Sequence, residues 1–88
     1  MSLAFIDFDR DPGKGVVRYI EVKGHKGPSL IAELSEYEYE IAKEKGDNYW
    51  LYIVHSIATG NPQLVAIRNP LKNMKVEVIE SRKYHLTP

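Results

Sequence analysis

The sequence predicts an α+β domain, with a mixed, mostly antiparallel sheet of about five strands and one main helix on one face. Two stretches rich in branched and aromatic residues, 3–8 and 16–23, flank a turn signal at Pro12 and predict a hairpin. A helical pattern over 35–45 leads into the most strand-like run of the chain, 49–57. A strand, a helix and a second strand form a crossover, so we expect 49–57 to lie parallel to its neighbour in the sheet, with a right-handed connection.

The main helix has signals at both ends. Pro28 interrupts the chain before 29–34, which is either a short strand or a run-in to the helix, and we expect a short strand. Ser35, with Glu38 three residues later, forms a capping box, and Gly46 ends the helix. Positions three and four apart predict one helical face, which contains Leu34, Tyr37, Ile41 and Lys45.

The second half of the chain contains further strand signals. Residues 49–57 are apolar on both parities, which predicts a central, buried strand, and 63–67 returns after a turn as the second strand of a hairpin. Residues 71–74 can form one helical turn. Residues 75–80 alternate charged and apolar side chains, which indicates an edge strand with one wet face. A short strand at 84–86 fits within an otherwise polar tail.

Length and composition narrow the class of protein. Eighty-eight residues form one domain, 1–88, and 12 basic residues balance 12 acidic ones, so no global field attracts nucleic acid or a membrane. There is no cysteine and no apolar run long enough to span a membrane. We therefore expect a soluble, cytoplasmic protein with no membrane partner. Residues 1–3 are consistent with an expression-vector remnant, and 71–88 form a C-terminal extension that contains the edge strand.

A carboxylate and an amine lie two residues apart inside an apolar strand, at Glu21 and Lys23. Residues at this spacing project from the same face of a strand, here together with Tyr19. One interpretation is an ion pair on a solvent-facing edge, which the tripeptide alone favours because Glu-x-Lys is a common string. The other is a hydrolytic site, in which the carboxylate holds a divalent cation and the lysine orients water or stabilises phosphate charge.

The wider context favours the second interpretation. Three segments, 18–24, 32–42 and 46–54, resemble the NO VEIN C-terminal domain, and the resemblance covers about 5–70. That family is similar to the PD-(D/E)xK restriction-endonuclease-like superfamily, and it occurs near the C-terminus of many prokaryotic helicases and restriction-type proteins. The resemblance implies a restriction-endonuclease-like core over 4–70. It also implies that Glu21 and Lys23 are the catalytic pair and that Mg²⁺ is the cofactor.

The superfamily signature also needs an aspartate on the preceding strand. If the loop is centred at Pro12-Gly13, opposite residues sum to 25, and Glu21 faces Ala4, which cannot bind a metal. Asp7 and Asp9 are the nearest substitutes, but in this register Asp7 lies on the other face from Glu21. A sum of 26 would bring Asp7 to the Glu21 face, and Asp7 would then join Glu21 as a metal ligand.

Other residues offer further candidates. Glu36 and Glu40 on the helix are alternative acids, although their stripe is typical of a solvated face. His25, just past the strand, can contact phosphate or act as a general base, or can simply be exposed. Nucleic-acid contacts are expected from His25, Lys26, Lys14 and Arg10 near one end of the hairpin. The aromatic residues Tyr49, Trp50 and Tyr52 can stack on bases, but in a buried strand they are usually core.

These observations support three classes of function. The first is an accessory, nucleic-acid-associated domain of a larger helicase-like or restriction-type protein, with a degenerate or incomplete nuclease site. The second is a magnesium-dependent nuclease that uses Glu21 and Lys23. The third is a protein-interaction module that pairs through the edge strand at 75–80. The expected partners are parent helicase or ATPase domains, weakly bound nucleic acid, or a second copy in a homodimer. We also expect Glu21 and Lys23 at the mouth of a cleft edged by the 25–28 loop and the helix start.

Overall fold

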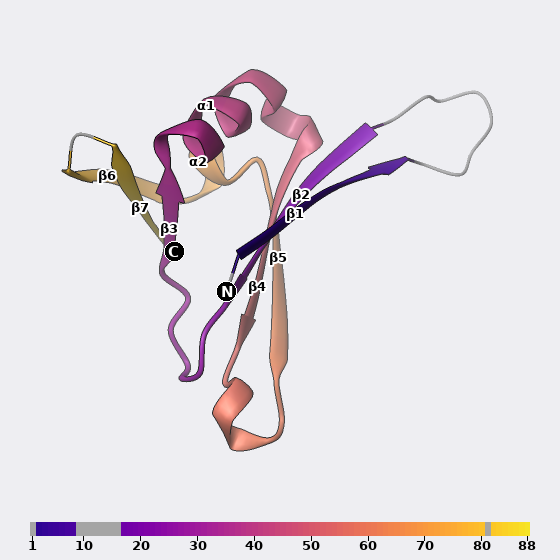
Figure 1. Ribbon diagram of the computed structural model, residues 1–88, viewed down its shortest axis with the longest axis vertical. Helices are drawn as coiled ribbons and strands as arrows, with labels where there is room; N and C mark the ends of the chain where they lie inside the picture. The colour runs from indigo at the N-terminus through magenta and orange to yellow at the C-terminus, as the bar shows by residue number, and fades with distance from the viewer. Residues whose placement is uncertain (1, 9–16, 81) are drawn as a thin grey trace.

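Two sheets and one main helix form the fold, and a computed structural model describes residues 2–8, 17–80 and 82–88 (Figure 1). The first sheet has four strands in the order β1-β2-β4-β5, and the second has three in the order β3-β7-β6. The strands of the first sheet are β1 (Ser2–Phe8), β2 (Val17–Gly24), β4 (Tyr49–His55) and β5 (Gln63–Arg68). Those of the second are β3 (Ala32–Ser35), β6 (Lys75–Glu80) and β7 (Lys83–Thr87).

The first sheet is mixed, as the sequence predicts. β1 and β2 are antiparallel, and their register pairs Ala4 with Glu21 and Asp7 with Arg18, so opposite residues sum to 25. β2 and β4 are parallel, which confirms the predicted crossover through the helix, and β5 returns antiparallel to β4. β2 is therefore a central strand of the sheet that contains the Glu-x-Lys motif.

The α+β class and the single main helix are confirmed, but the strands divide into two sheets where the sequence predicts one sheet of about five. The division arises because β3 pairs with β7, near the other end of the chain, and not with β2 or β4. β6 is an edge strand of this second sheet, as predicted, but all six of its residues are exposed, so it does not have the single wet face that the sequence predicts. In Figure 1 the second sheet lies to one side of the four-stranded sheet, with the main helix at the top of the view.

The helix α1 (Glu36–Lys45) begins with the predicted capping box. The Ser35 hydroxyl accepts a hydrogen bond from the Glu38 backbone N–H at 3.2 Å, and the Glu38 carboxylate accepts one from the Ser35 N–H at 2.9 Å. The helix ends at Gly46, whose φ of 54° suits a residue without a side chain. Three short helical segments follow along the chain: η1 (Gly46–Asn48), η2 (Ile57–Thr59) and α2 (Pro70–Asn73).

The structure confirms only part of the face that spacing predicts: Leu34 is buried and Ile41 packs against the core, with Ala42 beside them. Tyr37 is 71% exposed, whereas Ala42 is buried. Glu38 turns toward the sheet, and Ala42, four residues later, lies on the same side of the helix. The helix is therefore rotated by about one residue from the predicted orientation.

The core lies between the first sheet, the second sheet and α1. Its fully buried side chains include Leu34 from β3, Leu86 from β7 and alternate residues of β4. Those β4 residues are Tyr49, Leu51 and Ile53. Trp50 and Tyr52, on the other parity, are only half-buried, so β4 is not buried on both faces as predicted. In the described part of the chain, no helix is long and apolar enough to span a membrane.

Candidate functional site: a carboxylate–lysine cluster

The Glu-x-Lys motif lies on the core-facing side of β2. Glu21 aligns with the buried Leu51 of β4, and its side chain is 1% exposed. Lys23 aligns with the buried Ile53, and its side chain is 12% exposed. The structure thus places both residues on one face of a central strand. The interpretation as an ion pair on a solvent-facing edge does not describe this pair.

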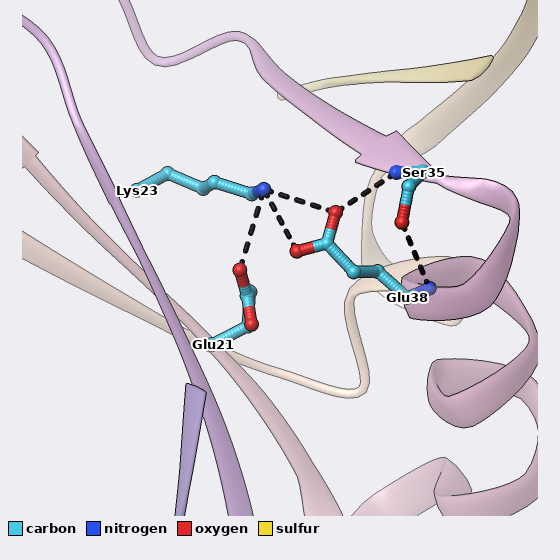
Figure 2. A network of polar contacts seen from close by, with 4 residues as sticks. All are labelled: Glu21, Lys23, Ser35 and Glu38. Carbon is cyan, nitrogen blue, oxygen red and sulfur yellow. Dashed lines mark hydrogen bonds and ion pairs between the residues drawn. The ribbon is translucent and has the colours of Figure 1, made fainter. Parts of the chain in front are cut away.

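A third residue completes the cluster, and it comes from the start of α1 (Figure 2). The Lys23 Nζ lies 3.3 Å from Oε1 of Glu21. It also donates to both carboxylate oxygens of Glu38, at 3.1 Å to Oε1 and 3.0 Å to Oε2. In Figure 2 the ammonium group lies between the two carboxyl groups, one from the sheet and one from the helix. We call Glu21, Lys23 and Glu38 the lysine cluster.

Glu38 has two roles at once. Its Oε1 accepts both from the Ser35 backbone N–H and from Lys23, so the helix cap and the ion pair share an atom. Capping groups satisfy the free N–H groups at a helix start, and an anion there is also favoured by the helix dipole. The cluster therefore fixes the position of the first turn of α1 against β2.

The electrostatics of Glu38 follow from these contacts. Burial by itself would raise the pKa of Glu38, but hydrogen bonds with Glu21, the Ser35 backbone and Lys23, together with the Lys23 charge, lower it to about 2. Glu38 is therefore ionised at neutral pH.

Two tyrosines interact electrostatically with the cluster. Tyr49 is fully buried, and its hydroxyl has no hydrogen-bond partner among the residues the structure describes. Burial raises the pKa of Tyr49 far above its usual value, and the charges of Glu21 and Glu38 raise it further. The same causes raise the pKa of Tyr19, whose ring stacks on that of Tyr49 with centroids 5.3 Å apart. Both phenols stay neutral at physiological pH.

The position opposite Glu21 belongs to Ala4, as the sum of 25 predicts. The observed register pairs Asp7 with Arg18, a position of the other parity from Glu21. The alternative register, with Asp7 across from Tyr19, is therefore not the one that forms. Asp9 lies outside the described residues. The carboxylate that does meet Glu21 and Lys23 is Glu38.

The chemistry of the cluster depends on what occupies its centre. Two carboxylates on neighbouring elements are the kind of oxygen ligands that hold Mg²⁺. Here the Lys23 ammonium stands between them, so a cation would have to displace it. Within the described ranges, no three histidine, aspartate or glutamate side chains form a group suited to a metal ion.

The connector after β2 holds the remaining described candidates. The ring of His25 is hydrogen-bonded through Nε2 to the carbonyl of Ile31, so this histidine is engaged by its own loop. Lys26 is exposed, and its carbonyl accepts from the N–H of Ala58, so the connector runs alongside the chain that follows β4. Arg10 and Lys14 lie outside the described residues, and the predicted cluster of cations stays a prediction. The start of α1 does flank the motif, whereas the predicted cleft stays a prediction.

The comparison with family models shows which family this chain belongs to. The model described as Protein NO VEIN, C-terminal matches residues 4–67, which is most of the chain. The chain belongs to the NO VEIN C-terminal domain family. The match contains the whole lysine cluster and ends before β6 and β7. A search of curated proteins and a search of solved structures found no match.

The sequence of this NO VEIN C-terminal domain predicts Glu21 and Lys23 as site residues but does not predict Glu38. Its place in the Ser35 capping box assigns its side chain to the helix backbone, so the acids that the sequence suggests for the helix are Glu36 and Glu40, beside Asp7 and Asp9 of the hairpin. The Glu36 and Glu40 side chains are 53% and 58% exposed, as expected of a solvated face. The order of the elements is a signal that could have identified Glu38. A helix that follows a strand and a connector can bring its first turn back toward that strand, and Glu38 lies in the first turn of α1.

Proposed function

We propose that this domain is an accessory, nucleic-acid-associated domain of a larger helicase-like or restriction-type protein, with a nuclease-like site that is incomplete. Family membership supports a domain role, since the family is described as the C-terminal part of a protein. The Glu-x-Lys pair on the core-facing side of a central strand supports the nuclease-like ancestry of the site.

The arrangement around Lys23 is the reason why we describe the site as incomplete. The Lys23 ammonium is held by Glu21 and Glu38, and the residue opposite Glu21 is Ala4. A nuclease of this type needs two carboxylates free to hold a magnesium ion and a lysine free to act on water or phosphate. In this cluster the lysine neutralises the carboxylates in place of a metal ion. Catalysis would first have to break the hydrogen bonds that also cap α1.

The test is cleavage of plasmid, single-stranded and branched DNA, and of RNA, with magnesium or manganese. The wild-type protein is expected to show no cleavage above that of a Glu21→Ala, Lys23→Ala double variant. An Ala4→Asp variant restores a carboxylate opposite Glu21, because paired residues of antiparallel strands share a face. Cleavage by the wild type that the double variant lacks would overturn the proposal.

A magnesium-dependent nuclease is the second candidate, and the position of Glu38 favours it. Glu38 supplies a second carboxylate near Glu21, so the pair would hold Mg²⁺ if Lys23 moved toward the substrate. This candidate predicts cleavage that Glu21→Gln and Glu38→Gln both abolish and that Glu40→Gln leaves intact.

A further inference from the structure

The second sheet ends in β6, and one edge of this strand has no neighbouring strand among the described residues. In Figure 1 β6 and β7 reach to the left of the view, away from the first sheet. All six residues of β6 are exposed. Unpaired backbone N–H and C=O groups along such an edge form a template on which another strand can pair.

The core-facing side of the second sheet continues onto β6 without a cover. Val76 aligns with Leu86 of β7, which aligns with Ala32 of β3, and both of those residues are fully buried. Val76 itself is 39% exposed, and Val78, next on the same face, is 64% exposed. Two valines thus extend the buried face beyond the layer that covers it, and a chain placed beside β6 would remove them from water.

Two charged side chains of β6, Lys75 and Glu77, form no ion pair within the described ranges. Glu77 aligns with His85 of β7, but the Nε2 atom of that histidine lies 3.8 Å from the Glu33 carboxylate on β3. Lys75 and Glu77 lie two residues apart, so they project from the same face, opposite to that of Val76. A strand that pairs with β6 therefore meets one positive and one negative charge on this face.

A second copy of β6 matches both charges in one antiparallel register. A two-fold axis perpendicular to the sheet exchanges the strands, so it must pass through a pair of identical residues. With Val76 on the axis, the Lys75 of each copy faces the Glu77 of the other. With Glu77 on the axis, two like charges face each other, which is destabilising. With Val78 on the axis, Glu77 faces an apolar residue and neither charge is matched.

We propose that the protein forms a symmetric dimer in which the β6 strands of two copies pair antiparallel, with Val76 at the two-fold axis. The pairing joins the two second sheets into one continuous sheet and gathers the exposed valines of both copies on its core-facing side. The register irregularity of β6 between Val78 and Glu80 lies at the end of the paired segment, so the centre stays regular. Charges on an edge strand oppose unrelated strands, and the two Lys75–Glu77 contacts favour the same sequence as partner.

The dimer does not depend on the nuclease-like site. The lysine cluster belongs to β2 and α1, and β6 lies outside residues 4–67, which the family model matches. The interface therefore follows from the C-terminal strands of this chain. Cleavage activity in the wild type would overturn the incomplete site and leave the dimer standing, and a monomeric protein would do the reverse.

Charge reversal at the two paired positions tests the interface. Sedimentation of the wild-type protein, from micromolar to near-millimolar concentration, is expected to show a monomer that converts to a dimer. Glu77→Lys places lysine opposite lysine at both contacts and should raise the dissociation constant about tenfold or more, and Lys75→Glu should act alike with glutamates. A mixture of the two variants restores opposite charges at both contacts, so a heterodimer of about wild-type affinity is expected. A folding defect in either variant cannot produce this rescue.

Glu44→Lys is the matched control, because it makes the same charge change on α1, at a side chain that is 69% exposed. It should change the dissociation constant by less than about twofold, since single exposed charges contribute little. Circular dichroism checks that each variant is folded.

A single introduced cysteine tests the register, because the chain has no cysteine of its own. Val76→Cys places the two thiols directly across the axis, within reach of a disulfide, so oxidation should cross-link the dimer. Val78→Cys places them four residues apart along the strands, about 13 Å, and should not cross-link.

Four results would overturn the proposal. The first is a monomer at every concentration, which would mean that β6 pairs with a different chain or with none. The second is equal weakening by Glu77→Lys and Glu44→Lys, which would place the interface elsewhere. The third is failure of the mixed variants to associate. The fourth is a cross-link through Val78→Cys without one through Val76→Cys, which would exclude the register that the charges select.

Discussion

Replacing Glu38 by alanine tests whether the lysine cluster holds the helix to the sheet. The change removes the acceptor of the Ser35 N–H and both of Glu38's bonds to Lys23. Loss of the cap costs about 1 kcal/mol. Lys23, only 12% exposed, keeps its contact with Glu21, so leaving it half-paired costs about 1 to 2 kcal/mol, less than for a fully buried pair.

The expected loss in the free energy of unfolding is therefore about 2 to 3 kcal/mol, or roughly 10–20 °C in Tm for a domain of this size. Urea denaturation followed by Trp50 emission measures it, with an unchanged dependence on urea as the check for two-state behaviour. Glu38→Gln keeps an acceptor for the Ser35 N–H but loses the charge, so it should fall between the wild type and Glu38→Ala.

Glu40→Ala is the matched control, because Glu40 is 58% exposed and its ion-pair partner within the described ranges is Lys43, at 4.0 Å. This substitution should lower the free energy of unfolding by less than about 0.5 kcal/mol. If Glu38→Ala and Glu40→Ala destabilise equally, the cluster does not hold the helix, and the physical account of the site is wrong.

Three further changes test the same region. Glu38 has a folded pKa of about 2, below its ordinary 4.5, so its contribution is complete above about pH 4.5 and is lost as pH falls toward 2. At 1.36 kcal/mol per pH unit the difference between 4.5 and 2 corresponds to about 3 kcal/mol, which is an upper value because water reaches 19% of the Glu38 side chain and screens its charge. The stability gap between wild type and Glu38→Gln, measured by urea unfolding at pH 7, 4 and 3, should shrink accordingly, and a constant gap would count against this. Tyr49→Phe removes a buried hydroxyl without a described partner, so stability should stay equal or rise by up to about 1 kcal/mol, whereas a loss above that would reveal a partner. Ser35→Ala should lower Tm by several degrees and Ser35→Asp should recover most of it, and equal melting curves for the two would refute the cap.

Local signals account for the parts of the fold that the sequence predicted. The β1–β2 register follows from loop length and side-chain parity, which already predict Ala4 opposite Glu21. Ser35 and Gly46 mark the two ends of the helix, because each makes its capping hydrogen bond with a residue three or four positions away, Glu38 and Ala42 respectively. The parallel pairing of β2 with β4 follows from the order of strand, helix and strand.

The second sheet could not be predicted from local sequence signals. β3 pairs with β7 across about fifty residues, and no local pattern specifies such a partner. The third member of the lysine cluster could not be predicted for the same reason. Glu38 meets Lys23 only because α1 packs with its first turn against β2, and the capping pattern already explained its presence. The exposure of Trp50 and Tyr52 depends on which face of β4 the second sheet and α1 cover.

The central claim is that Lys23, held by Glu21 and Glu38, takes the place of a metal ion in a nuclease-like site. Manganese binding followed by electron paramagnetic resonance tests it most directly, on the wild type beside Ala4→Asp and Glu21→Gln. The account predicts wild-type affinity weaker than about 1 mM, unchanged by Glu21→Gln, and tighter binding by Ala4→Asp. Micromolar binding by the wild type that Glu21→Gln abolishes would contradict it.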